Sequence, residues 1–226
     1  MNQTLTRRVV AEFLGTSFLL AVVVGSGIMA ERLAGGNIAL ALMANTIAIA
    51  AALLALILTF GTISGAHFNP IVSLAALIET RIDWKVFAIY CCAQIAGAIA
   101  GVVLANKMFG LPAITLSQHT RGGPELLLSE FVASFGLVMV IAGSARLRYN
   151  AVAFAVAAYI GAACWFTPST SFANPAVTIA RSLSDTFVGI APGNVAGFIV
   201  AQIVGGVAAT VLFKWLIPKP QDRETN

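Results

Sequence analysis

"SFANPAVTIARS", residues 171–182, places an Asn-Pro pair at the head of a short apolar segment that carries little charge. A similar pair lies in "HFNPIVSLA", residues 67–75. Asparagine is a favoured helix N-cap because its side-chain oxygen accepts a bond from an otherwise unpaired N–H, and proline is favoured at the next position. Only about ten apolar residues follow each pair, whereas a membrane crossing needs about 20. The sequence therefore predicts two half-length, re-entrant helices that start at Asn69-Pro70 and Asn174-Pro175.

The composition indicates that the chain lies in lipid. Hydrophobic residues make up 59% of it and charged residues 10%, whereas about a quarter of the residues of soluble domains are charged. The long apolar runs lack the alternation of barrel strands, so we predict an all-α membrane protein with six transmembrane helices plus the two half-helices. The first run is taken as a retained crossing although arginines precede it. The crossings are predicted at about 9–30, 38–60, 84–106, 125–144, 150–168 and 193–217.

Three segments of the first half recur in the same order in the second. They are "AEFLGTSFLL" and "SEFVASFGLV", "HFNPIVSLA" and "FANPAVTIA", and "AQIAGAIAG" and "AQIVGGVAA". A unit with three crossings places its second copy in the opposite orientation, which predicts an inverted repeat. We expect a single channel domain over residues 1–226 with repeats at about 1–110 and 120–220. The half-helices then approach each other from opposite faces, and the irregular backbone before them predicts a cavity.

The lysines and arginines indicate the orientation in the membrane. Nine of the 13 fall on the side of the two termini, namely Arg7, Arg8, Arg81, Lys85, Arg146, Arg148, Lys214, Lys219 and Arg223. The other side has Arg32, Lys107, Arg121 and Arg181. The positive-inside rule then predicts a multi-pass protein of the cell membrane, plasma or inner, with both termini cytoplasmic. The net charge of +4 gives no reason to expect nucleic-acid binding.

The two half-helices favour neutral solutes. Each helix N-terminus carries about half a positive charge, so two of them near the midplane oppose the passage of cations and hydronium. Two asparagine amides at the same place offer hydrogen bonds to an uncharged solute. The pattern therefore predicts a channel for small neutral molecules.

These motifs resemble the aquaporin, or major intrinsic protein, family. The resemblance rests on "AEFLGT", "SGAHFNPIVSLA", "SFANPAV" and the paired glutamates and glutamines, and it covers nearly the whole chain. It implies one pore per subunit in a homotetramer, with Asn69 and Asn174 as the pore asparagines. Glu12 and Glu130 would hold the re-entrant loops, with a proton relay as the alternative. His67 would line the cytoplasmic half of the pore, with loop packing as its alternative.

The departures from the family pattern concern selectivity. Counting from the two asparagines, the four positions of the outer filter are Ile49, Ala162, Ser171 and Val177, with Val177 where the family usually has arginine. Such a filter has no fixed charge and no aromatic ring, which favours solutes larger than water, such as glycerol-like polyols and metalloid acids including arsenous acid. Ile71, where the family usually has alanine, is expected to line the pore, or else to narrow or reshape the contact between the half-helices.

Arg181 lies four residues after Val177, about one helical turn further out on nearly the same face. We expect it to carry the positive charge of the outer vestibule, where it repels cations without narrowing the pore. The alternative is an ordinary surface arginine near the lipid headgroups.

Two other transport classes share some of these features. A proton-coupled secondary transporter is also built from inverted repeats with half-helices, and Glu12, Glu130 and His67 are its candidate titratable groups. A formate or nitrite channel would use the positive half-helix ends, but His67 is badly placed for it. An enzyme is not expected, because the sequence lacks paired aspartates, a nucleophile elbow and a phosphate loop. Neither a cofactor nor a metal is predicted, and the three cysteines lack metal-ligand spacing.

Overall fold

The computed structural model describes residues 3–147 and 149–217, and every regular element in these ranges is a helix. The order is α1 (Leu5–Leu33), α2 (Ile38–Ser64), α3 (Pro70–Ile78), α4 (Trp84–Met108), α5 (Pro124–Leu147), a 3₁₀ turn (Tyr149–Ala151), α6 (Val152–Phe166), α7 (Pro175–Arg181) and α8 (Pro192–Leu216). The predicted all-helical fold is confirmed, and α3 and α7 start at the predicted prolines. Three of the cations that predict the orientation, Arg148, Lys219 and Arg223, lie outside the described residues.

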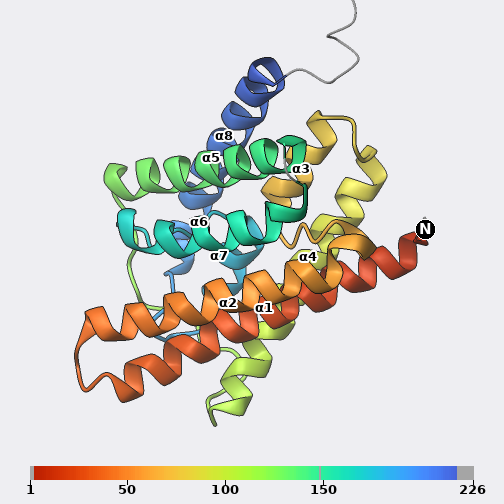
Figure 1. The fold of residues 1–226 in the computed structure, drawn as a ribbon. Coiled ribbons are helices and arrows are strands. Elements are labelled where there is room, and N and C mark those ends of the chain that lie inside the picture. The colour runs from red at the N-terminus through yellow and green to blue at the C-terminus, as the bar shows by residue number, and fades with distance from the viewer. Residues whose placement is uncertain (1–2, 148, 218–226) are drawn as a thin grey trace, which may run out of the picture.

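The long helices form two groups that have the same internal arrangement. Helix α1 packs along α2 and α4, and α5 packs along α6 and α8 (Figure 1). The half-helix α3 contacts α4 and α8, while α7 also contacts both α4 and α8. Each half-helix is therefore held by helices from both halves of the chain. This arrangement agrees with the predicted inverted repeat, which remains an interpretation of the sequence.

Two glycines at corresponding positions of α4 and α8 allow close helix crossings. A Cβ on Gly97 of α4 would lie 2.4 Å from the backbone oxygen of Phe13 in α1, and one on Gly205 of α8 would lie 2.3 Å from that of Phe131 in α5. Real Cβ atoms do not approach backbone oxygens so closely, so any side chain here forces the helices apart. Phe13 and Phe131 directly follow Glu12 and Glu130, so both crossings lie next to the buried glutamates.

Alanine at Gly205 is expected to destabilise the protein by about 1–3 kcal/mol, because the added methyl overpacks a backbone contact. Gly193→Ala is the matched control, because a Cβ at this other glycine of α8 meets nothing within 4 Å. Thermal unfolding followed by fluorescence size-exclusion chromatography measures the difference. Equal midpoints for the two variants would show that α5 and α8 do not cross as closely as described.

The predicted crossing at 150–168 is shorter than the others. Five helices among the described residues are long and apolar enough to span a membrane, whereas α6 has 15 residues, or about 22 Å at 1.5 Å per residue. The chain leaves the helix at Thr167, which has an extended backbone with ψ of 128°. Pro168 is the physical reason, because proline disfavours the helical conformation of the residue before it.

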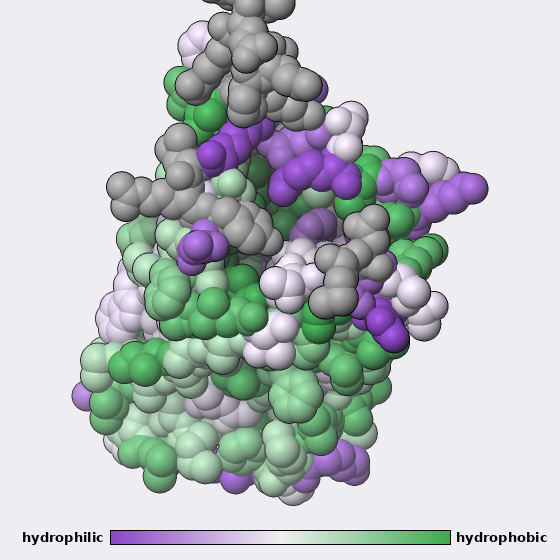
Figure 2. Space-filling view, turned by 45° about the vertical axis from the view of Figure 1, so that its right-hand side comes forward, coloured by the Kyte–Doolittle hydropathy of each residue, from purple (hydrophilic) through white to green (hydrophobic). Residues whose placement is uncertain are grey.

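The surface matches a molecule embedded in lipid. Many large hydrophobic side chains are exposed, among them Phe18, Ile47, Phe154 and Val211. In Figure 2 apolar residues cover most of the lower flank, and hydrophilic residues gather toward the top of the view. Exposure of so much apolar surface to water is unfavourable, whereas contact of the same surface with lipid hydrocarbon is not.

Candidate solute pathway

The two half-helices meet through their N-caps. The Asn69 amide donates from Nδ2 to the Ala173 carbonyl (2.7 Å), and the Asn174 amide donates to the Phe68 carbonyl (2.8 Å). Each side-chain oxygen caps its own helix, Asn69 by accepting from the Ile71 N–H (2.9 Å) and Asn174 by accepting from the Ala176 N–H (3.0 Å). Each amide nitrogen carries two hydrogens, and one of the two is used in these bonds. Both asparagines therefore retain a donor for a solute.

The loops before the asparagines have the same unusual backbone. Phe68 and Ala173, each directly before its asparagine, have φ values of 48° and 45°. Ala66 and Ser171, two residues earlier in each loop, have φ values of 48° and 50°. The left-handed region costs about 1–2 kcal/mol for a residue with a Cβ. Thr170 also has a positive φ of 61°. Five such residues in two loops require strong support from their surroundings.

Two fully buried glutamates bind these loops. Glu12 of α1 accepts bonds from the backbone N–H groups of His67 (3.0 Å) and Phe68 (2.7 Å), and Glu130 of α5 accepts from those of Phe172 (2.9 Å) and Ala173 (2.9 Å). A glutamine completes each set, with Gln94 donating to Glu12 (2.8 Å) and Gln202 to Glu130 (2.6 Å). An acceptor-only carboxylate suits a position faced only by donors.

An inner cavity of about 500 Å³ lies beside the asparagines. Asn69, Asn174 and His67 line it, together with aliphatic residues of α1, α2, α5 and α6. His67 is only partly free to contact a solute. Its Nδ1 is hydrogen-bonded to the Ser73 hydroxyl (3.0 Å) and its ring packs edge-on against Tyr90. The cavity therefore presents a few fixed polar groups on a mainly apolar wall.

A second, outer cavity of about 230 Å³ adjoins the first. Four aliphatic residues line both cavities, namely Val23, Ile49, Ile160 and Val177. Because these side chains border both spaces, they lie where the two cavities adjoin, and we call them the aliphatic constriction. Ile49 and Val177 are two of the predicted filter residues, and the predicted Ser171 lines the outer cavity just beyond them.

The prediction that Ala162 belongs to the filter is wrong. Ala162 is exposed, on the face of α6 that also exposes Phe154 and Phe166 at spacings of eight and four residues. Ile160 faces the constriction instead. Side chains two positions apart in an α-helix point about 200° away from each other. An error of two residues in counting back from Asn174 therefore moves the assignment to the opposite face of α6.

The prediction that Ile71 lines the pore is also wrong. Ile71 is fully buried in a small apolar cluster with Ala75, Val138 and Ala209, away from the inner cavity. Its side chain packs toward Gly206 of α8. The isoleucine therefore fills space between the half-helix α3 and α8 and does not narrow the pathway.

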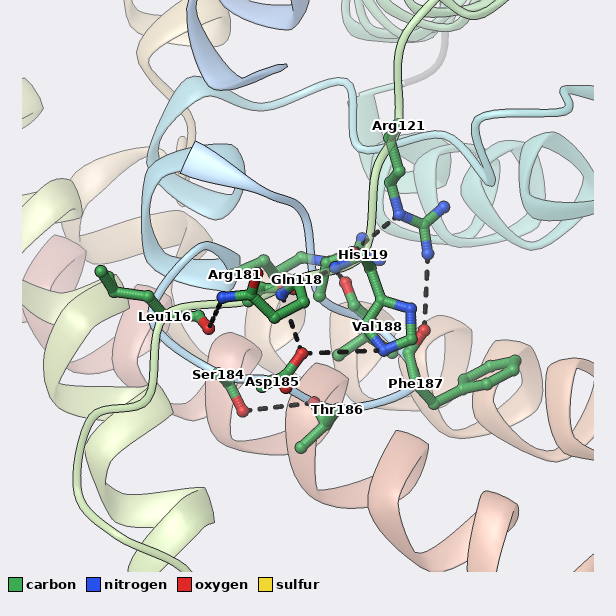
Figure 3. Close-up of polar contacts among 12 residues, drawn as sticks. Leu116, Gln118, His119, Arg121, Arg181, Ser184, Asp185, Thr186, Phe187 and Val188 are labelled. Atoms are coloured by element: carbon green, nitrogen blue, oxygen red, sulfur yellow. Dashed lines mark hydrogen bonds and ion pairs between the residues drawn. The ribbon is translucent and has the colours of Figure 1, made fainter. Parts of the chain in front are cut away.

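Arg181 is a buried residue of the outer cavity, which excludes the surface alternative, since only 4% of it is exposed. Its Nε donates to the Val188 carbonyl and its guanidinium stacks 3.4 Å from the centroid of the Phe172 ring. Figure 3 shows Arg121 reaching the same segment from the connection before α5. Arg121 donates to the carbonyls of Gly189 (2.7 Å) and Phe187 (3.4 Å).

Sequence reasoning missed Arg121 as a residue of the pathway. It lies in an irregular connection without a motif. Hydrogen bonds to Asn194, in the first turn of α8, and to Ser169, in the loop before α7, hold it at the outer cavity. Burial lowers the pKa of its guanidinium, and the negative charge of Glu130 opposes this shift. Arginine remains charged at neutral pH after such a shift.

The model of the family described as Major intrinsic protein matches residues 1–150 and 143–226. The chain belongs to the major intrinsic protein family. It is 52% identical over 224 residues to Aquaglyceroporin AqpS of Rhizobium meliloti, a match that covers 98% of this chain and 96% of the relative. It is 28% identical to Aquaporin Z of Rhodopseudomonas palustris, over 95% of each chain.

A solved structure supports the fold. The X-ray structure of the aquaglyceroporin from Plasmodium falciparum matches with a TM-score of 0.66 and 22% identity, covering 95% of this chain and 98% of that chain. Together these comparisons identify a membrane channel of the aquaporin class rather than an enzyme. Channels of this family pass water and small solutes.

Proposed function

We propose that this member of the family is a passive channel for water and small uncharged solutes, with a wide, uncharged outer constriction. The observation that carries the proposal is the aliphatic constriction of Val23, Ile49, Ile160 and Val177. Aliphatic side chains cannot replace the hydration shell of an ion. An ion that enters the constriction therefore loses its hydration without compensating contacts, which raises its free energy. A polyol or an undissociated acid has much less hydration to lose.

The asparagines provide the polar part of the pathway. Asn69 and Asn174 both line the inner cavity, and each has one amide hydrogen left for a hydroxyl oxygen. A solute leaving the constriction thus regains hydrogen bonds at the half-helix ends. The positive ends of α3 and α7 oppose cations and hydronium at the same place. Glycerol-like polyols and metalloid acids such as arsenous acid fit this order of contacts.

The glutamates act as structural supports for the loops in this proposal. Each carboxylate is fully buried and already accepts bonds from two backbone N–H groups and a glutamine. A proton relay needs a carboxyl that changes its partners during transport, whereas these are fixed by the loops that they hold. The bonding therefore favours a channel over a proton-coupled transporter.

The assembly and orientation belong to the same proposal. We infer a homotetramer in the plasma or inner membrane, with four independent pores and both termini cytoplasmic. Exposed apolar side chains on α2 and α8, including Ile47, Leu58 and Val204, support contacts with lipid or with neighbouring subunits. Arg181, together with Arg121, supplies positive charge at the outer cavity and repels cations there.

Stopped-flow light scattering on proteoliposomes tests the proposal. The wild type is expected to pass water, glycerol and arsenous acid at rates at least about ten-fold above empty liposomes, because the constriction lacks charge and aromatic bulk. An imposed pH gradient is expected to leave the final solute distribution unchanged. Passage of water alone would refute the wide constriction, and accumulation of solute driven by the pH gradient would refute passive transport.

A further inference from the structure

The outer cavity contains two cationic side chains and no carboxylate partner. Arg121 and Arg181 both line it. Among the described residues neither guanidinium forms an ion pair. Both lie over one ring, with guanidinium carbons 5.3 Å and 3.4 Å from the centroid of Phe172. Two like charges therefore lie in one small cavity enclosed largely by protein, where their repulsion is stronger than in bulk water.

Asp185 and Glu130 are engaged elsewhere. Asp185 is exposed, accepts a bond from the Gln118 N–H (2.9 Å), and lies 3.9 Å from Nε2 of His119 (Figure 3). Glu130 is occupied by the loop before Asn174 and by Gln202. Backbone carbonyls are the only acceptors that the described residues offer to the two guanidinium groups.

The cavity also contains a hydroxyl without a partner. The Ser171 side-chain oxygen is buried and makes no hydrogen bond, and only 6% of the residue is exposed. Ser171 lines the same cavity as the two arginines. A buried hydroxyl without a partner costs about 1–3 kcal/mol, so this position gains stability when a ligand supplies an acceptor.

We propose that the outer cavity is a binding site for a small monovalent carboxylate or oxyanion, held between Arg121, Arg181 and Ser171. Two guanidinium groups neutralise the charge and donate to its oxygens, and the serine hydroxyl donates one more bond. A cavity of about 230 Å³ accommodates an anion of the size of formate or acetate. The aliphatic constriction lies directly below and cannot solvate a charge, so the anion stays in the vestibule and competes with neutral solutes for this space.

Carbon-13 formate provides a direct probe of the site. Purified protein in detergent micelles is titrated with the labelled anion, and its NMR line width is compared with that in empty micelles. Saturable broadening is expected for the wild type. Arg121→Gln and Arg181→Gln are each expected to weaken formate binding about ten-fold or more, because each removes a charge-assisted hydrogen bond. Ser171→Ala is expected to weaken it several-fold, because it removes one hydrogen bond from a neutral hydroxyl.

Lys107→Gln is the matched control, because Lys107 is an exposed cation of the same predicted side that lies outside the cavity. It is expected to bind formate as the wild type does. If Arg181→Gln does not fold, Arg121→Gln and Ser171→Ala decide the question. Broadening that is absent, or that is equal in wild type, Arg121→Gln and Ser171→Ala, would overturn the proposal.

The result is separable from the proposed channel function, because binding is measured without flux. External formate is further expected to reduce glycerol flux in the wild type and to leave that of Arg121→Gln unaffected. A channel that passes glycerol but does not bind formate loses the anion site alone. A protein that binds formate with the stated variant pattern but passes only water keeps the site and loses the wide constriction.

Discussion

The Val177→Arg variant is expected to lose about ten-fold or more of its glycerol and arsenous acid permeability while keeping most of its water permeability. Val177 is one of the four residues that line both cavities, and only 6% of it is exposed. Arginine adds a long side chain where the two cavities adjoin. Water needs the least width of the three solutes, so it is affected least.

Charge adds to the effect of size in this variant. The outer cavity already contains Arg121 and Arg181, and a third guanidinium raises the repulsion among them. The new side chain is therefore expected to point toward the asparagines, across the constriction, where it donates to passing water. Cation leak is expected to remain low, since the positive charge near the pathway increases.

Val177→Met separates size from charge. Methionine adds length without charge and adapts to irregular spaces, so we expect a smaller loss of glycerol flux than with arginine. Water flux through both variants serves as the measure of folded channels. Glycerol flux through Val177→Arg equal to that of the wild type would contradict the position of Val177 at the constriction.

The half-helices were predictable because local chemistry decides them. Asn69-Pro70 and Asn174-Pro175 meet the requirements of an N-cap and a first helical residue without reference to any other part of the chain. The apolar runs likewise predict the long helices, since hydrocarbon thickness sets their length. Even the end of α6 has a local cause in Pro168, although the predicted crossing extended past it.

The errors arose where the direction of a side chain depends on distant contacts. Ile71 is the second residue after Asn69 and Val177 is the third after Asn174. Ile71 packs against α8, whereas Val177 borders the cavities. Ala162 is predicted in place of Ile160 because the count back from Asn174 crosses the loop between α6 and α7, and the length of that loop decides which face of α6 the count reaches. Arg121 carries no local signal at all, because its place depends on carbonyls of a segment more than 45 residues away in sequence.

Glu130→Leu is expected to destabilise the protein severely. Leucine leaves the N–H groups of Phe172 and Ala173 and the Gln202 amide without their acceptor, in a fully buried position. Each unpaired buried group costs about 1–3 kcal/mol, which together approaches the whole stability of an ordinary domain. The left-handed backbone of Ala173 loses its support as well. We expect little folded protein by fluorescence size-exclusion chromatography.

Glu130→Gln distinguishes loop support from proton transfer, because glutamine keeps one acceptor oxygen but turns an NH₂ group toward the remaining donors. Loop support predicts a lowered melting temperature and reduced flux of every solute in proportion to the folded fraction. A relay predicts normal folding with loss of any response to a pH gradient. Glu125→Gln, at an exposed acid in the first turn of the same helix, controls for the loss of charge and is expected to change stability by less than about 1 kcal/mol. A Glu130→Gln protein as stable as Glu125→Gln would show that the carboxylate is not needed to hold the loop before Asn174.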